Sequence, residues 1–102
     1  MADIIKTATR DAYGKALIEL GHKDKNVIVM DSDLAEATRT GKFKKEFPDR
    51  FFDSGIAECD MMCIAAGLAA TGHTVFASSF AMFAAGRAFE QIRNSIAYPN
   101  LN

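Results

Sequence analysis

A long stretch without charged side chains constrains this sequence more than any other feature. From Met61 to Gly86 there is no Asp, Glu, Lys or Arg, and an apolar run of that length raises the question of a membrane span. A glycine turn at residues 72–74 and two serines at 78–79 divide the run. We therefore interpret it as a buried helix, a turn, a buried strand and the start of another helix within a folded domain.

Length and composition agree with a single folded domain. The chain has 102 residues, of which 49% are hydrophobic and 25% charged, and its formal net charge is -1. These values exclude an intrinsically disordered chain. Without a basic excess, neither nucleic acid nor an anionic membrane is expected as a partner. Two cysteines are too few to staple a secreted fold, and no signal-peptide pattern is visible, so we expect a cytoplasmic protein.

Helices and strands are predicted to alternate along the chain. The run at residues 26–30 lacks the alternation of a half-exposed strand, which indicates a strand covered on both faces. The pattern predicts an α/β fold with a parallel sheet and flanking helices. Three strands cover little surface, so we expect an incomplete domain that another segment or chain completes. The first helix is expected to begin after a cap at Thr7 or Thr9 and to stop at Gly21. Further helices are expected at 42–47, 56–71 and 81–95; strands at 26–30, 50–53 and 74–77; and a loop at 35–41.

Two acids follow the first predicted strand. Asp31 and Asp33 stand at the end of the strand where α/β sheets bind ligands, so they could hold a divalent metal or polarise a ligand. The other interpretation is that they cap the following loop, and the spacing favours capping. Together with Asp53, the acids would also suit a receiver-like signalling module, although no later strand carries the lysine expected there.

The two cysteines are predicted to be ordinary thiols. Cys59 and Cys63 share one helix face, but His73 is the only other soft ligand nearby. Zinc sites need three or four closely spaced ligands. We therefore expect no zinc site at these residues and interpret both cysteines as buried, reduced thiols.

Glu58 is the most informative polar residue. It lies in the first turn of the helix predicted at residues 56–71, where an acid is ordinarily a favourable partner of the helix dipole. Its apolar neighbours disfavour the charged form, whereas the helix N-terminus favours it, and the sequence leaves the balance open. A carboxyl in that balance can share a proton with a ligand nitrogen. Phe80 and Phe83 are either core residues or a wall for a flat heteroaromatic ring.

These motifs together resemble a known family. The chain resembles the pyrimidine-binding domain of transketolase, especially the C-terminal subunit of split transketolases. We identify residues 1–102 as the N-terminal part of such a domain. The shared motifs, in family order, are Ala8-Thr-Arg10, Asp31-Ser-Asp33-Leu34, Gly55-Ile-Ala-Glu58, Phe80-Ala-Met-Phe83-Ala-Ala-Gly86 and residues 87–94.

The resemblance implies that Glu58 is catalytic. In the family, this glutamate hydrogen-bonds a ring nitrogen of the aminopyrimidine of thiamine diphosphate and so promotes ylid formation. The family holds the diphosphate and Mg²⁺ on a separate domain with a Gly-Asp-Gly…Asn motif, which this sequence lacks. The resemblance therefore implies that a partner domain binds the metal and that this chain does not.

Further site residues follow from the same likeness. Phe80 and Phe83 match positions that pack on the aminopyrimidine, and Asp33 and Leu34 match positions near the thiazolium. Arg10 matches an arginine that contacts the substrate phosphate, a role suited to a guanidinium. The serine that assists this arginine in the family is Ala37 here, and Thr38 or Thr40 is the candidate replacement.

The implied activity is thiamine-diphosphate-dependent transfer of a two-carbon ketol unit between sugar phosphates. This chain would supply the pyrimidine side of a site shared with a diphosphate-binding domain or subunit, in a homodimer or hetero-oligomer. A 1-deoxyxylulose 5-phosphate synthase or the beta subunit of a 2-oxo acid dehydrogenase is the alternative within the enzymes. A non-catalytic fragment that serves only in assembly, or the receiver-like module, is the alternative outside them.

Overall fold

A three-stranded parallel sheet forms the centre of the chain. The computed structural model describes residues 2–102, and its strands are β1 (Val27–Asp31), β2 (Phe51–Asp53) and β3 (Thr74–Ser78). Their order is β2-β1-β3, and both pairings are parallel. Parallel neighbours require a crossover connection, which helices supply here. The predicted α/β fold, a parallel sheet with flanking helices, is confirmed.

β1 is the central strand, and all five of its residues are buried. Successive side chains of a strand point to opposite faces. Accordingly, Val27 and Val29 pack into one cluster with Leu17, Phe43 and Phe51. Ile28 and Met30 pack into the other, with Met61, Met62, Ala65 and Ala88. The absence of alternation in this strand therefore reflects cover on both faces, as predicted.

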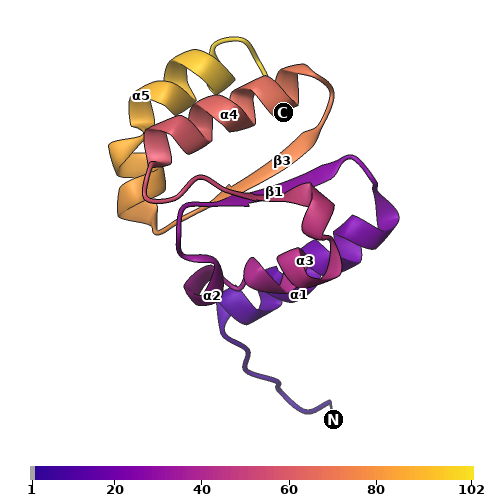
Figure 1. Cartoon of the computed structure of the whole chain (residues 1–102). Coiled ribbons are helices and arrows are strands. Elements are labelled where there is room, and N and C mark those ends of the chain that lie inside the picture. Colours follow the sequence, from indigo (N-terminus) through magenta and orange to yellow (C-terminus); the bar gives the residue numbers. More distant parts are fainter. Residues whose placement is uncertain (1) are drawn as a thin grey trace.

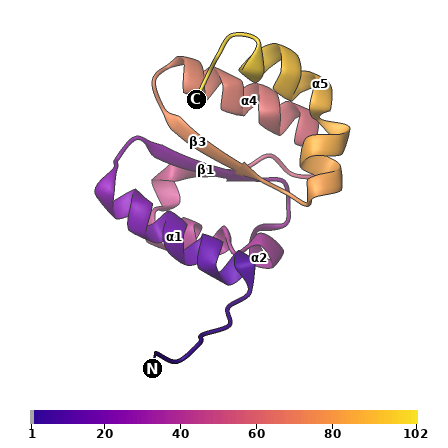
Figure 2. The same ribbon diagram turned by 180° about the vertical axis from the view of Figure 1, so that it is seen from behind.

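Two groups of helices enclose the sheet (Figures 1 and 2). On one face lie α1 (Thr9–Lys23), α2 (Ala35–Thr38) and α3 (Gly41–Glu46), followed by the short 3₁₀ turn η1 (Pro48–Arg50). On the other face lie α4 (Glu58–Ala70) and the last helical stretch, which contains η2 (Met82–Arg87), α5 (Phe89–Gln91) and η3 (Ile92–Ala97). The sheet is thus the middle layer of three.

Gly21 does not end the first helix, contrary to the sequence-based expectation. α1 continues to Lys23, and Gly21 is buried inside it. A Cβ at this position would lie 2.5 Å from Cε2 of Phe47 and 2.8 Å from Cε2 of Phe43. The glycine therefore serves close packing against two aromatic rings, a requirement that no local sequence pattern reveals.

The loop expected at residues 35–41 is also wrong in part. Residues 35–38 form α2, and α3 begins at Gly41, so only Arg39 and Thr40 separate the two helices. Arg39 takes a left-handed conformation with φ 70°, which turns the chain between them. Small polar residues form a helix here because the buried carboxylate of Asp31 accepts hydrogen bonds from the hydroxyls of Thr38 and Thr40.

The charge-free run folds largely as expected. It comprises most of α4, a turn at Gly72 with φ 98°, strand β3 and the start of the last helical stretch. That stretch reaches Ala97, and many of its turns are of the wider π type. Within residues 2–102, no helix is both long enough and apolar enough to cross a membrane. Met82 and Phe89 remain 70% and 60% exposed, so the layer leaves apolar surface uncovered.

The expectation of buried thiols is wrong for Cys63 and only partly met for Cys59. α4 packs Met61, Met62 and Ala65 against the sheet. Cys63 is exposed and Cys59 is half-buried, and both are free. The helix is apolar on nearly all sides, so no apolar stripe distinguishes its buried face from its exposed face.

Candidate functional site

Five of the six residues that the resemblance singles out follow the carboxyl ends of the three strands. Because the strands are parallel, these ends meet at one edge of the sheet, where α/β folds bind ligands. The sixth, Arg10, lies in the first turn of α1. Asp33 and Leu34 follow β1, Glu58 follows β2, and Phe80 and Phe83 follow β3.

Glu58 is the first residue of α4, and it is 2% exposed. Its Oε1 accepts a hydrogen bond from Nη1 of Arg87 at 2.6 Å, and its Oε2 accepts one from the hydroxyl of Ser32 at 3.3 Å. A buried carboxylate needs such partners, because transfer of an unpaired charge from water is very unfavourable. The predicted desolvation of Glu58 is therefore present, together with a cationic partner that sequence reasoning missed.

Arg87 could not have been paired with Glu58 from the sequence. Its side chain is 52% exposed, as is usual for a charged residue on a helix surface. The two residues lie 29 positions apart on different elements, so no local spacing connects them. The sequence signal for a contact of Arg87 is its position four residues, about one helical turn, after Phe83. In the structure its guanidinium carbon lies 4.7 Å from the centroid of the Phe83 ring.

Phe80 and Phe83 form a small aromatic surface beside this ion pair. Their ring centroids are 6.0 Å apart, and the planes differ by 22°, so the rings are nearly parallel. Phe80 is 45% exposed, and Phe83 is half-buried. Neither belongs to a core cluster of buried residues in the described part of the chain. The rings thus offer flat surface to a ligand.

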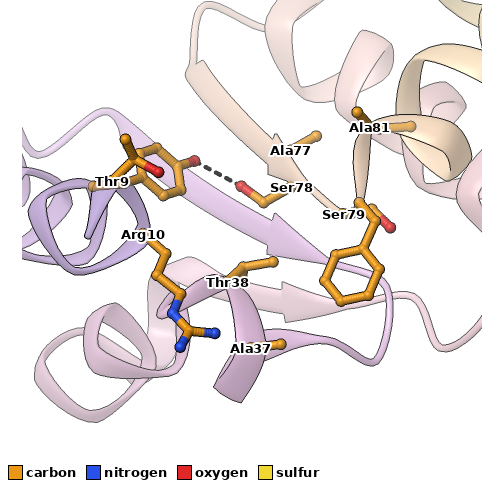
Figure 3. A pocket seen from close by; sticks show the side chains of 11 residues that line it. Thr9, Arg10, Ala37, Thr38, Ala77, Ser78, Ser79 and Ala81 are labelled. Atoms are coloured by element: carbon orange, nitrogen blue, oxygen red, sulfur yellow. Dashed lines mark hydrogen bonds between the residues drawn. The ribbon is translucent and has the colours of Figure 1, made fainter.

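An open depression of about 570 Å³ lies between α1 and the end of β3 (Figure 3). Arg10, Ala37 and Thr38 line it on one side, and Ser79 and Phe80 on the other. Of the six candidate residues it contains only Arg10 and Phe80, while Glu58 and Phe83 are outside its lining. Ser32 links the two places, because its hydroxyl contacts that of Ser79 at 3.2 Å as well as Glu58.

Tyr13 forms part of the same depression. Its hydroxyl is 2.6 Å from that of Ser78, a hydrogen bond that Figure 3 shows as a dashed line. Burial raises the pKa of Tyr13 above its usual value, because it disfavours the phenolate, and the bond with Ser78 opposes this effect. The depression therefore has a neutral, hydrogen-bonded floor beside the cationic Arg10.

Asp31 acts as a cap of the following loop, the interpretation that its spacing favoured. It is fully buried. Its Oδ1 accepts the backbone N–H of Leu34 at 2.7 Å, and its Oδ2 accepts the hydroxyls of Thr38 and Thr40 at 2.6 and 2.8 Å. Both hydroxyls donate to the Asp31 carboxylate, and Thr40 is itself buried. Neither threonine is therefore free to donate to a phosphate in place of the serine that Ala37 replaces.

Asp33 and Leu34 lie apart from the depression that contains Arg10. They border a second shallow hollow, together with Asp53. Asp33 has φ 60°, and its N–H donates to Oδ1 of Asp53 at 3.0 Å, which also accepts the N–H of Gly55 at 2.8 Å. Asp53 thus shapes two loops at this edge. Within residues 2–102, no three His, Cys, Asp or Glu side chains gather as a metal site would require.

Comparison with known proteins gives one consistent family. Residues 5–102 match the model of the transketolase pyrimidine-binding domain. A putative transketolase C-terminal section from Methanocaldococcus jannaschii is 60% identical over 91% of this chain, and human transketolase is 48% identical over 95%. The chain spans only 29% and 16% of these relatives.

A solved structure agrees with the sequence comparison. It is described as a split gene transketolase in an inactive β4 tetramer. It superimposes with a TM-score of 0.86 at 58% sequence identity, and the match covers 96% of this chain and 33% of that one. At this identity the likeness extends beyond the fold alone.

Proposed function

This chain belongs to the transketolase pyrimidine-binding domain family, and on that basis we propose that it supplies the pyrimidine side of a thiamine diphosphate site. The enzyme in which it works would transfer a two-carbon ketol unit between sugar phosphates. The observation that carries this proposal is Glu58, a carboxylate 2% exposed at the carboxyl edge of the sheet, with two near-parallel phenylalanine rings close by.

The residues at this edge fit the aminopyrimidine ring. A flat heteroaromatic with a ring nitrogen needs an aromatic surface for stacking and a carboxyl for the nitrogen. Phe80 and Phe83 offer the surface, and Glu58 offers the carboxyl. Thiamine diphosphate, when bound, supplies the carbanion chemistry of ketol transfer. Glu58 would hold and share the proton at the ring nitrogen, and the buried position keeps water from it.

The diphosphate and its Mg²⁺ are assigned to a partner domain or subunit. The described residues contain no cluster of acidic, histidine or cysteine side chains for the metal, and the chain spans 29% of the Methanocaldococcus relative. The solved relative is described as the inactive β4 tetramer of a split gene transketolase. This supports a hetero-oligomer or dimer in which activity depends on the partner.

Substrate recognition is assigned to Arg10. Its guanidinium has a fixed positive charge and a fork of donors that suits a phosphate, and it lines the open depression beside Phe80. The cytoplasm is proposed as the compartment, which two free thiols support. A 1-deoxyxylulose 5-phosphate synthase or 2-oxo acid dehydrogenase would use a similar glutamate, but the relatives reported above are all transketolases.

The test compares two glutamate variants in the chain assembled with a diphosphate-binding subunit. Glu58→Gln keeps the size of the side chain but cannot share a proton, so we expect ketol transfer to fall by about 10²–10⁴-fold. Exchange of the thiazolium proton with deuterium oxide, followed by NMR, should slow in parallel. Glu90→Gln is the matched control, because Glu90 is an exposed acid that pairs only with surface groups. A Glu58→Gln complex with wild-type exchange and turnover would refute the assignment.

A further inference from the structure

Arg87 joins the two groups that the proposed function assigns to the aminopyrimidine. It ends η2, and its Nη1 donates to Oε1 of Glu58 at 2.6 Å. Its guanidinium carbon lies 4.7 Å from the centroid of the Phe83 ring. One planar cation therefore contacts the buried carboxylate and an aromatic face at the same time.

The two partners of this ion pair differ in their freedom to move. The side chain of Glu58 is 2% exposed and that of Arg87 is 52% exposed. Glu58 is also held at Oε2 by Ser32, whereas the guanidinium contacts the Glu58 carboxylate and the Phe83 ring, and no other side chain among residues 2–102 holds it by a hydrogen bond or ion pair. A long, half-exposed side chain can turn into solvent without disturbing the core. Arg87 is thus the movable member.

A guanidinium and an aminopyrimidine use the same contacts. Both are planar, both place N–H donors in that plane, and both stack on aromatic rings. A flat ring that bonds Glu58 and stacks on Phe83 would meet the Arg87 guanidinium in its path. Paired in this way, the arginine satisfies a buried charge that would otherwise be costly.

We propose that Arg87 is a displaceable cap of the cofactor site. Its guanidinium competes with the aminopyrimidine for Oε1 of Glu58 and for the ring of Phe83, and cofactor binding moves it outward. This inference rests on the proposed function, since it takes Glu58 and Phe83 as the pyrimidine contacts. Arg87 is not assigned a catalytic step.

The experiment measures thiamine diphosphate binding to the chain assembled with its diphosphate-binding subunit, by stopped-flow for the rate constant and by calorimetry for Kd. Arg87→Met keeps the aliphatic stem but removes the guanidinium, so we expect association to become several-fold faster and Kd to fall several-fold. Arg87→Lys keeps a charge beside Glu58 and protects the fold, but it loses the flat stacking surface. It should bind faster than wild type by a smaller factor.

Arg93→Met is the matched control. Arg93 lies on the same helical stretch, is 59% exposed and pairs only with Glu90, so its removal should leave both constants unchanged. If Arg87→Lys folds as wild type but binds the cofactor no faster, or more weakly, the cap is refuted. As a second measurement, the ¹⁵Nε resonance of Arg87 should shift on addition of thiamine diphosphate, and an unmoved resonance would refute the cap as well.

The Glu58 and Arg87 variants distinguish a failure of the cap from a failure of the proposed function. Wild-type binding together with slowed proton exchange in Glu58→Gln would support the function, whatever Arg87 does. Under that outcome, unchanged binding in the Arg87 variants overturns the cap alone. If the wild-type complex fails to bind thiamine diphosphate, the function and the cap are both wrong.

Discussion

Replacement of Asp31 by asparagine should lower the free energy of unfolding by about 2–3 kcal/mol, because three donors converge on this fully buried carboxylate. The N–H of Leu34 and the hydroxyls of Thr38 and Thr40 lie 2.6–2.8 Å from its oxygens. A hydrogen bond to a charged group contributes about 1 kcal/mol more than a neutral one. Asparagine offers one acceptor oxygen, so in either amide orientation at least one donor must also be rearranged.

Urea unfolding of the chain, followed by circular dichroism, measures this cost. For a domain of this size the same loss corresponds to a fall in Tm of roughly 10–20 °C. Asp31→Ala removes all three acceptor contacts and should cost more than asparagine, about 5 kcal/mol. Asp53→Asn is the matched control, since Asp53 is an exposed acid that also accepts two backbone N–H groups, and its loss should be much smaller.

A result near zero for Asp31→Asn would refute the reasoning. It would mean that desolvation of the buried charge already cancels what the three bonds contribute. A wild-type stability that rises with added Mg²⁺, and no longer does so in Asp31→Asn, would instead support the metal-ligand interpretation over capping.

Two further predictions use matched pairs of residues. Gly21→Ala should destabilise the chain by about 1–2 kcal/mol in urea unfolding, because the new methyl group would collide with Phe43 and Phe47. Gly67→Ala, where no atom lies within 4 Å of the new methyl group, should stabilise it by up to about 1 kcal/mol. Equal effects of the two substitutions would contradict the packing role of Gly21. The raised pKa of Tyr13 means that the folded chain retains the phenol proton more strongly than the unfolded chain, so stability should be full below pH 10.0 and decline as the pH rises above it. Tyr13→Phe should flatten that decline in a pH series, and Tyr98→Phe, at an exposed position, should not.

The sequence predicted the elements whose signals are local. The run Val27–Met30 is apolar without alternation, and it became the strand buried on both faces. The segment at 35–41 was missed because its order depends on Asp31, whose bonds reach seven and nine residues along the chain. Gly21 was misread because a cap and a packing glycine look alike until the phenylalanines that contact it are known.

The candidate site likewise contains residues that local motifs identify and residues that only distant contacts identify. Glu58 and Phe80 could be selected from motifs that each lie within one segment. The hydrogen-bond partners of Glu58 are Ser32, directly after β1, and Arg87, at the end of η2. Both lie more than 25 residues from Glu58, so no local pattern could identify them. Motif likeness grouped Asp33 with Phe80, whereas the structure lines two separate hollows with them. The roles of these residues remain predictions.

The position of β1 between its neighbours has a consequence for synthesis on the ribosome. The residues that cover its α1 side, Leu17, Phe43 and Phe51, are all present once the chain has emerged to residue 51. Those that cover its other side extend to Ala88. The nascent chain can therefore bury one face of its central strand early, while Ile28 and Met30 wait for the part of the chain that also delivers the aromatic pair and Arg87.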